Sequence, residues 1–349
     1  MTAALKVVLA TPLAPELRHL ITEVDPGVEL LVDDDLLPPQ RFPGDHSGDP
    51  AYRRTPEQAR AFEELLARAD VLYGIPDVDP RLLAAAVARN PGLRWVQTMA
   101  AGGGSTVQAA NLSDADLARV TFTTSAGVHG ATLAEFALFG VLAGAKDLPR
   151  LQQLKAAREW PARWAMRQVG EQTVLVVGLG GIGQQTAKLL KGLGATVLGV
   201  KRTPAAVDFV DEVHTDSALP ELVARADAIV FTLPGTDSTS GLYDAELIAA
   251  TKPGAVIVNV GRGTVIDEPA LIDGLSDGRL HSAYLDVTAV EPLPADSPLW
   301  TLPNVVIAPH TAALNDKEDE RIAELFAANL RAFLDGRPLR NVVDPAEFY

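Results

Sequence analysis

Six residues near the middle of the chain have the spacing of a pyrophosphate-binding turn. The segment G-L-G-G-I-G at 178–183 follows an apolar run at 174–177 and opens an amphipathic pattern at 182–193. Between a strand and a helix, such glycines permit a tight turn, a close approach of the backbone to phosphate, and close packing of the helix on the strand. The helix N-terminus adds unpaired N–H groups and a positive dipole. This pattern predicts a dinucleotide site that includes Gly178, Gly180, Gly181, Ile182 and Gly183.

The end of the next apolar run, at 196–200, bears on which dinucleotide binds. An NAD site normally has an acidic residue here, which accepts a hydrogen bond from the ribose 2′-hydroxyl. This chain has Lys201, Arg202 and Thr203 instead. Two cations and a hydroxyl suit a 2′-phosphate, and an arginine fork can bind it through two hydrogen bonds. We therefore expect NADP, with NAD as the alternative if the two cations only face solvent.

These residues need a framework of strands and helices, and the hydrophobic pattern predicts one. Short apolar runs alternate with helical patterns, which is typical of parallel sheets with helices on both faces. In the first third of the chain we expect strands at 6–10, 71–75, 93–97 and 120–123, with helices at 56–69 and 80–88. From residue 173 onwards we expect six strands, at 174–177, 196–200, 228–233, 255–260, 282–285 and 305–308. The fold class is thus α/β, with two Rossmann-like, doubly wound parallel-sheet domains.

Residues 38–55 interrupt this rhythm. They combine Pro, Gly, Asp and His between two periodic segments, which predicts an exposed loop. A tolerated surface insertion is the simpler interpretation, and a flap over the active site is the alternative.

Composition excludes several classes of function. The 349 residues contain 30 Lys and Arg against 45 Asp and Glu, a net charge of -15, which argues against nucleic acid and anionic membrane as partners. There is no cysteine, so disulfides and thiolate metal sites are excluded, and we expect no metal. No apolar run reaches about 18 residues, and residues 1–17 lack the pattern of a signal peptide. We expect a cytoplasmic protein.

Further motifs occur in an order that resembles the D-isomer-specific 2-hydroxyacid dehydrogenase family. After the glycine segment come L-P…T…T…G within 233–241, V-N-V-G-R-G at 258–263, L-D-V at 285–287 followed by E-P-L-P at 291–294, and N-V-V-I-A-P-H-T at 304–311. The resemblance covers about residues 90–345. It implies a discontinuous substrate domain, residues 1–127 and 310–349, around a cofactor domain at 128–309, with the active site between them.

The resemblance also assigns roles to particular residues. It implies that His310 is the proton donor, that Glu291 bonds the imidazole and favours its protonated form, and that Arg262 holds the substrate carboxylate and polarises the carbonyl. Histidine suits this role because it titrates near neutral pH. Asp286 would contact the nicotinamide carboxamide, and the backbone of the loop at 101–103 would bind the substrate carboxylate. Further residues implied at the cofactor and substrate sites are Pro234, Thr239, Val260, Gly261, Ala101, Gly102 and Gly103.

The implied activity is hydride transfer between a nicotinamide cofactor and a small 2-keto acid/D-2-hydroxy acid pair, as in glyoxylate or hydroxypyruvate reductases. A phosphoglycerate dehydrogenase-like enzyme is an alternative, although these 349 residues lack the regulatory domain that many such enzymes carry. A dinucleotide-sensing binding protein, like the corepressors built on the same scaffold, is another. The family further implies a homodimer, and Trp160 and Trp164 suit such an interface if they are exposed.

Overall fold

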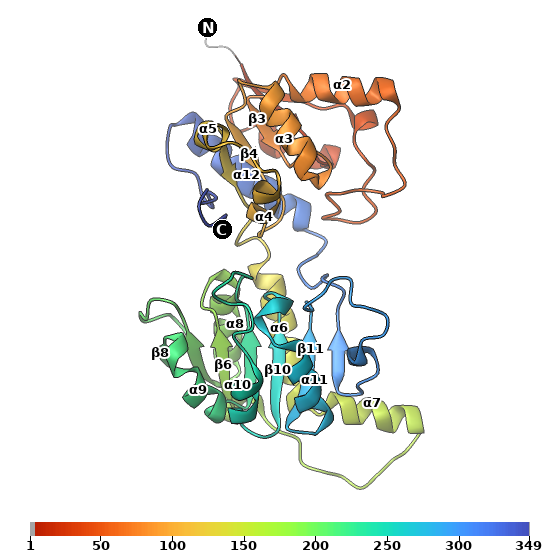
Figure 1. Cartoon of the computed structure of the whole chain (residues 1–349), viewed down its shortest axis with the longest axis vertical. Helices are drawn as coiled ribbons and strands as arrows, with labels where there is room; N and C mark the ends of the chain where they lie inside the picture. Colours follow the sequence, from red (N-terminus) through yellow and green to blue (C-terminus); the bar gives the residue numbers. More distant parts are fainter. Residues whose placement is uncertain (1–3, 349) are drawn as a thin grey trace. The chain divides into compact units, whose positions relative to one another are not determined.

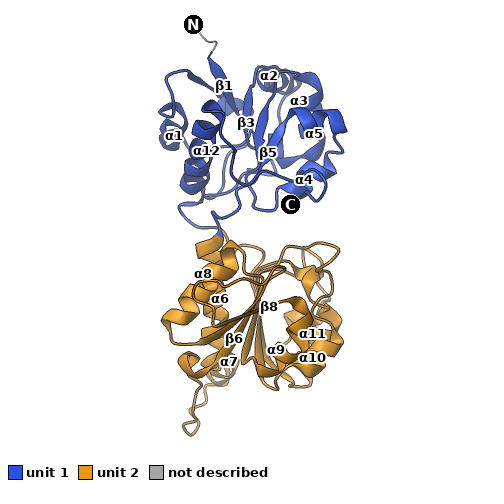
Figure 2. Ribbon diagram, turned by 90° about the vertical axis from the view of Figure 1, so that its left-hand side faces the viewer, with its two compact units in different colours: residues 1–129, 314–349 blue, residues 130–313 orange. Residues whose placement is uncertain are grey.

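The computed structural model describes residues 4–348, and the chain forms two compact units (Figure 2). Unit 1 comprises Met1–His129 and Leu314–Tyr349, and unit 2 comprises Gly130–Ala313. Both crossings lie a few residues beyond those expected near Gly127 and His310. The second one is displaced because the backbone N–H of His310 bonds the carbonyl of Asp286, which ties this turn to unit 2.

Unit 1 is built on a five-stranded sheet in which every neighbouring pair of strands is parallel. The strand order is β2-β1-β3-β4-β5. The strands are β1 (Leu5–Leu9), β2 (Val28–Leu31), β3 (Val71–Tyr73), β4 (Trp95–Gln97) and β5 (Thr121–Thr123). The helices are α1 (His19–Thr22), α2 (Pro56–Leu66), α3 (Pro80–Arg89), α4 (Gly104–Ala109), α5 (Asp114–Arg119) and α12 (Glu318–Leu334). The late helix α12 belongs here because its apolar face, with Phe326 between Tyr73 and Trp95, completes the core of this unit.

Unit 2 is built on a seven-stranded parallel sheet in the order β12-β11-β10-β9-β6-β7-β8 (Figure 1). Its strands are β6 (Thr173–Val177), β7 (Thr196–Val200), β8 (Glu212–His214), β9 (Ala228–Phe231), β10 (Ala255–Asn259), β11 (Leu280–Leu285) and β12 (Val305–Ile307). Its helices are α6 (Gly130–Ala145), α7 (Leu148–Ala157), α8 (Gly181–Gly192), α9 (Leu219–Arg225), α10 (Ala245–Ala250) and α11 (Glu268–Ser276).

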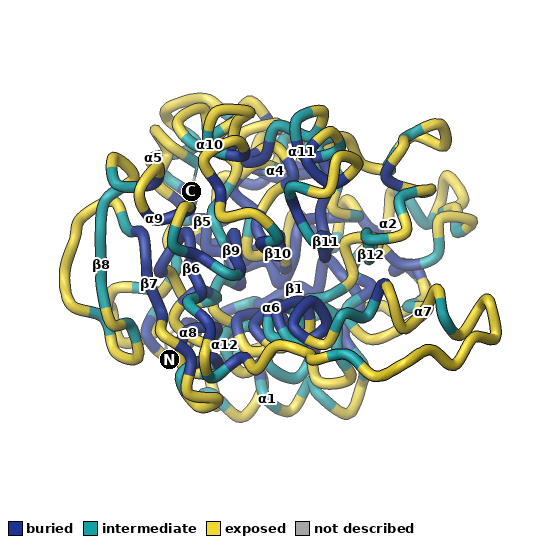
Figure 3. The backbone as a smooth tube through the Cα atoms, turned by 90° about the horizontal axis from the view of Figure 1, so that it is seen from below, coloured by how far each residue is buried: buried dark blue, intermediate teal, exposed yellow. Residues whose placement is uncertain are grey.

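Both faces of the unit 2 sheet are buried, which explains why its strands are continuous apolar runs. Successive residues of one strand enter different layers: Val174 and Val176 pack with α6 and α8, whereas Leu175 and Val177 pack with α9, α10 and α11. The central strands are accordingly buried in Figure 3. The α/β class with two doubly wound parallel sheets is confirmed.

Two edge strands were missing from the expected set. β2 is half-exposed with the sequence V-E-L-L, and β8 has only three residues, E-V-H. Edge strands need an apolar side chain on at most one face, so neither gives the continuous apolar run by which the other strands were recognised.

The segment 38–55 is less exposed than its composition predicted. Asp45 and Gly48 are buried, and Gly44 donates its N–H to Asp319 of α12 at 3.2 Å. The segment is a loop without helix or strand, as expected, and much of it is exposed, but polar contacts that its composition does not reveal hold part of it in the core. Separately, no helix within residues 4–348 is long and apolar enough to cross a membrane.

Candidate active site

The glycine turn joins β6 to α8 and leaves room for a ligand. Gly178 has φ +104°, a conformation that favours glycine, and a Cβ on Gly183 would lie 1.9 Å from the carbonyl oxygen of Gly178. By contrast, a Cβ on Gly180 or Gly181 would meet no described atom within 4 Å. Gly178 and Gly183 thus close the turn, whereas Gly180 and Gly181 border open space at the N-terminus of α8. This cradle fits a pyrophosphate.

The cations after β7 are available to an anion. Lys201 is fixed through its N–H, which bonds the carbonyl of His214 at 2.9 Å, and Arg202 and Thr203 are exposed. Within residues 4–348, neither Lys201 nor Arg202 forms an ion pair. Asp211 lies at the other end of β7, where it accepts the N–H of Val197 and bonds Lys191, which lowers the pKa of Asp211. A 2′-phosphate at the end of β7 would therefore meet two cations without an ion-pair partner among the described residues.

A histidine–carboxylate pair lies after the neighbouring strands β11 and β12. His310 Nδ1 is 2.7 Å from Glu291 Oε2, and both side chains are part-exposed, at 47% and 37%. The other carboxylate oxygen, Oε1, accepts the N–H of Thr288 at 3.1 Å. Nε2 of His310 has no hydrogen-bond partner among the described residues. This arrangement keeps one proton on Nδ1 and leaves Nε2 to exchange a proton with a ligand.

Asp286 organises the backbone around this histidine. Its Oδ1 accepts the N–H groups of Thr311 and Ala312, each at 2.9 Å, and its side chain is buried. Burial raises the pKa of Asp286, while these two hydrogen bonds oppose the rise. The residue expected to touch the nicotinamide therefore also holds the turn that presents His310.

Arg262 follows β10, the next strand of the sheet, and its backbone is fixed from two sides. Asn259 Nδ2 donates to the carbonyl of Arg262 at 3.0 Å, and Asn259 Oδ1 accepts the N–H of Gly261. A Cβ on Gly263 would lie 1.9 Å from the backbone of Thr288, so this turn packs directly on the residue that holds Glu291. The Arg262 side chain is exposed and pairs with no carboxylate in the described part of the chain.

The structure thus brings Arg262, Glu291 and His310 to the carboxyl ends of three adjacent parallel strands, β10, β11 and β12. Ligands of open α/β sheets bind at this edge. Two supporting residues were missed by the sequence reasoning, Asn259 and Thr288. Asn259 lies inside the V-N-V-G-R-G motif, so its position was a usable signal, whereas Thr288 stands out only through its contacts.

Other expected cofactor residues have structural roles in the described chain. Thr239 Oγ1 donates to the carbonyl of Pro234 at 2.7 Å and closes the loop after β9. Val260 is buried in the layer beneath α6 and α8, and a Cβ on Gly261 would lie 2.5 Å from the carbonyl oxygen of Leu233. Each shapes the edge where the dinucleotide is expected.

The loop expected to bind the substrate carboxylate belongs to unit 1 and follows β4. Gly103 donates its N–H to Ala100, whereas the N–H groups of Ala101 and Gly102 reach no acceptor in the described residues. These two groups are free to bind an anion. A Cβ on Gly103 would collide with Thr98 at 1.9 Å, so glycine is required there by close packing. Elsewhere, the described residues hold no group of three side chains suited to a metal ion.

A glycine turn that fits a pyrophosphate, a histidine–carboxylate pair and an arginine without a carboxylate partner at one sheet edge are what a nicotinamide-dependent dehydrogenase needs. Comparison with known proteins specifies the family. Residues 138–312 match the D-isomer specific 2-hydroxyacid dehydrogenase, NAD binding domain. The chain belongs to the D-isomer specific 2-hydroxyacid dehydrogenase family, whose members are NAD(P)-dependent enzymes acting on CH–OH donors.

Among curated relatives, glyoxylate/hydroxypyruvate reductase B of Escherichia fergusonii is 32% identical over 83% of this chain and 89% of its own length. D-3-phosphoglycerate dehydrogenase of Mycobacterium tuberculosis is 33% identical over 79% of this chain and 53% of its own.

Among solved structures, a family member from Xanthobacter autotrophicus Py2 in complex with NADPH and MES has a TM-score of 0.78 at 30% identity, covering 99% of this chain and 100% of that one. The NADPH-dependent glyoxylate/hydroxypyruvate reductase of Sinorhizobium meliloti, with NADP and sulfate, has a TM-score of 0.76 at 25% identity, with the same coverage.

Proposed function

We propose that this enzyme reduces a small 2-keto acid, first of all glyoxylate or hydroxypyruvate, to the D-2-hydroxy acid with NADPH. The observation that carries the proposal is the His310–Glu291 hydrogen bond of 2.7 Å, with Nε2 of the ring free and Arg262 unpaired at the adjacent strand end. A keto acid offers the two groups that this pair and this arginine would bind, a carbonyl oxygen and a carboxylate.

When bound, the dinucleotide supplies the hydride, which goes to the carbonyl carbon. His310 gives the proton on Nε2 to the carbonyl oxygen during reduction and takes it from the hydroxyl in the reverse direction. Glu291 stabilises the imidazolium through Nδ1 and fixes the orientation of the ring. Arg262 neutralises the carboxylate and stabilises the negative charge that develops on the oxygen.

The preference for NADPH rests on the unpaired cations after β7. Lys201 and Arg202 would bind the 2′-phosphate, and Thr203 would donate a hydroxyl hydrogen bond. Two structural relatives were solved with NADPH or NADP, which supports this choice over NAD.

The substrate is tested by following nicotinamide absorbance. NADPH and NADH are each combined with glyoxylate, hydroxypyruvate, pyruvate, phenylpyruvate and 3-phosphohydroxypyruvate. We expect turnover with NADPH and either glyoxylate or hydroxypyruvate. Turnover of 3-phosphohydroxypyruvate alone would favour the phosphoglycerate dehydrogenase alternative, which the 33% identical mycobacterial relative supports. Tight dinucleotide binding without any turnover would contradict the proposal and favour a sensor.

We further propose that two copies of the chain associate through α7 and residues 158–168. This arm is almost wholly exposed (Figure 3) and carries Trp160, which is 99% exposed, together with Met166. Phe139 of the neighbouring α6 is also exposed. Large apolar side chains gathered on one protruding segment are typical of an interface, and the family resemblance implies a second copy as the occupant.

A further inference from the structure

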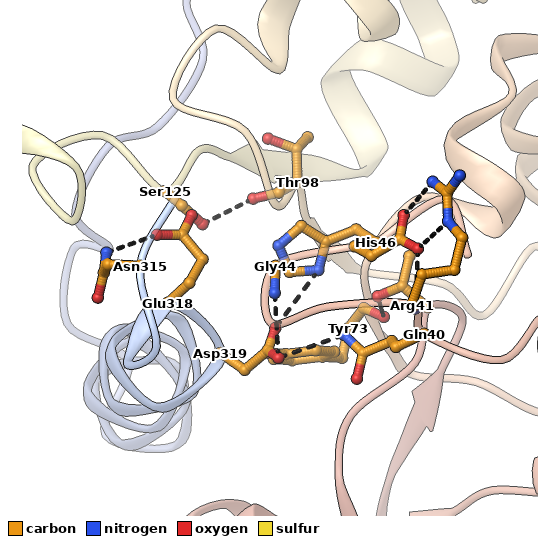
Figure 4. Close-up of polar contacts among 12 residues, drawn as sticks. Gln40, Arg41, Gly44, His46, Tyr73, Thr98, Ser125, Asn315, Glu318 and Asp319 are labelled. Carbon is orange, nitrogen blue, oxygen red and sulfur yellow. Dashed lines mark hydrogen bonds and ion pairs between the residues drawn. The ribbon is translucent and has the colours of Figure 1, made fainter. Parts of the chain in front are cut away.

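A buried polar cluster in unit 1 lies outside the residues assigned above. Its centre is the N-terminus of α12, where Glu318 and Asp319 are 1% and 7% exposed (Figure 4). Buried carboxylates persist only when they are paired or hydrogen-bonded. Their partners come from two other segments of unit 1, 38–55 and 124–129.

The pair between Glu318 and His129 joins the two places where the chain enters and leaves unit 1. His129 is the last residue before the chain passes into unit 2, and Glu318 lies shortly after its return at Leu314. His129 Nε2 bonds Glu318 Oε1, and Asn315 Nδ2 donates to Oε2 at 3.3 Å. The side chains of both His129 and Glu318 are buried. This contact therefore fixes the segment that ends at His129 to the start of a 17-residue helix.

That same segment supports the loop after β4. Ser125 Oγ donates to the carbonyl of Thr98 at 2.9 Å, and the N–H of Ser125 reaches the carbonyl of Ala100 at 3.3 Å. From the other side, Asn341 Nδ2 donates to the carbonyl of Ala126 at 2.8 Å. The segment 124–129 is thus held at Asn341 and at Glu318, and it in turn holds the backbone that leads into Ala101.

The segment 38–55 encloses the cluster on another side. Gln40 Nε2 and the N–H of Gly44 both donate to Asp319 Oδ2 at 3.2 Å, and His46 Nδ1 lies 3.8 Å from Oδ1 (Figure 4). The Arg41 guanidinium donates two hydrogen bonds of 2.7 and 3.0 Å to the Asp45 carboxylate, which lowers the pKa of Asp45. The segment therefore acts as a cover that keeps the Glu318–Asp319 region out of water.

We propose that His129 and Glu318 are positioning residues for the substrate loop. Through the segment 124–129 they hold Ser125 where it fixes Thr98 and Ala100, so that the free N–H groups of Ala101 and Gly102 keep the orientation that binds a carboxylate. The proposal rests on the proposed function for the identity of that carboxylate. The contacts themselves lie wholly within unit 1.

The test compares His129→Ala with His129→Gln. Alanine removes the bond to Glu318 and loosens the loop, so KM for the keto acid should rise about tenfold while the Kd for NADPH stays unchanged, because the dinucleotide residues belong to unit 2. Glutamine returns an N–H donor near the position of Nε2 and should bring KM back towards the wild-type value. An unchanged KM in His129→Ala overturns the proposal.

Two controls separate positioning from a general loss of stability. Leu66→Ala creates a cavity under α2, away from the cluster, and should lower Tm without changing KM. The double variant His129→Leu/Glu318→Met replaces both buried polar side chains by apolar ones, and such a replacement of a whole buried pair is often neutral or stabilising. It should keep Tm and still raise KM. If KM instead follows Tm across the four variants, the pair is only structural and the proposal fails.

Hydrogen exchange gives a readout that needs no turnover. His129→Ala should speed amide exchange in peptides covering residues 98–110 but not in those covering 56–89. If the wild type reduces no keto acid, the proposed function fails, and faster exchange at 98–110 still supports the positioning role. Unchanged exchange there overturns the positioning role whatever the activity.

Discussion

At the scale of single residues, the two ring nitrogens of His310 have different environments. Nδ1 of His310 is committed to Glu291, and Glu291 is itself fixed by the N–H of Thr288. An acid–base group needs one free nitrogen and a fixed orientation, and this chain of contacts provides both. Because an ionised carboxylate only accepts hydrogen bonds, Glu291 favours the tautomer with a proton on Nδ1, and the N–H of Thr288 fixes Glu291 in turn.

Replacing His310 by alanine should lower kcat by about 10²- to 10⁴-fold, the usual contribution of a positioned acid–base group. The Kd of NADPH should stay unchanged, because the glycine turn is untouched. Stopped-flow turnover and fluorescence titration would measure the two quantities. Glu291→Gln serves as the comparison, since it keeps a hydrogen-bond acceptor but loses the charge, and its loss should be smaller. A normal kcat in His310→Ala would remove this residue from the chemistry.

Arg202 should decide the choice between the two dinucleotides. Arg202→Ala removes a charge-assisted contact to the 2′-phosphate and should weaken NADPH binding about tenfold or more, equivalent to ~1.5 kcal/mol or more. NADH binding should change little, because NADH lacks this phosphate. Lys188→Ala, which removes an exposed cation from α8, is the matched control and should affect neither strongly. Equal losses of NADPH and NADH in Arg202→Ala would refute the 2′-phosphate assignment.

At the scale of elements, α8 shows how one residue type has opposite effects at the two ends of a helix. Gly183 faces the carbonyl of Gly178 at a distance that excludes a Cβ, whereas a Cβ on Gly192 would meet no described atom within 4 Å. The first glycine is thus required by close packing of the helix on β6. The second one only adds conformational freedom to the unfolded chain.

These two positions therefore make a matched pair of substitutions. Gly183→Ala should destabilise the protein by about 1–3 kcal/mol through overpacking, and it should weaken dinucleotide binding because the turn must shift. Gly192→Ala should stabilise it by about 0.5–1 kcal/mol with unchanged binding. Thermal unfolding and a dinucleotide titration on both variants test this. A tolerated alanine at 183 would mean that the turn is more plastic than its geometry indicates.

At the scale of the whole molecule, α7 and residues 158–168 form an arm that is largely exposed among the described residues. The arm at α7 and 158–168 is mostly exposed in Figure 3 and extends beyond the unit 2 sheet in Figure 1. Arg150 lies 4.0 Å from the ring centroid of Trp164 and shields it, so Trp164 is half-buried. Trp160 has no such cover and is the residue that a second copy would bury first.

Light scattering after size exclusion should therefore give a mass near twice 36.9 kDa for the wild type. Trp160→Ser should shift the protein towards the monomer, because a fully exposed tryptophan is a typical interface anchor. Leu193→Ser, which alters an exposed leucine outside the arm, should leave the mass unchanged. A wild type that runs as a monomer at all concentrations would disprove the dimer.

The sequence by itself determined the elements that are buried on both faces and the motifs that follow them. Continuous apolar runs identified the central strands of both sheets, and glycine spacing located the turn before α8, because these features depend on neighbours along the chain. The motifs at 258–263, 285–294 and 304–311 likewise placed Arg262, Glu291 and His310 after successive strands.

Only the tertiary structure decided which of these residues meet. Edge strands β2 and β8 depend on pairing with distant strands rather than on their own composition, so no local pattern revealed them. The contact of the Gly263 turn with Thr288 and the pair of His129 with Glu318 join residues that lie far apart in the chain. Such contacts depend on how strands and helices pack, so a local sequence pattern does not predict them.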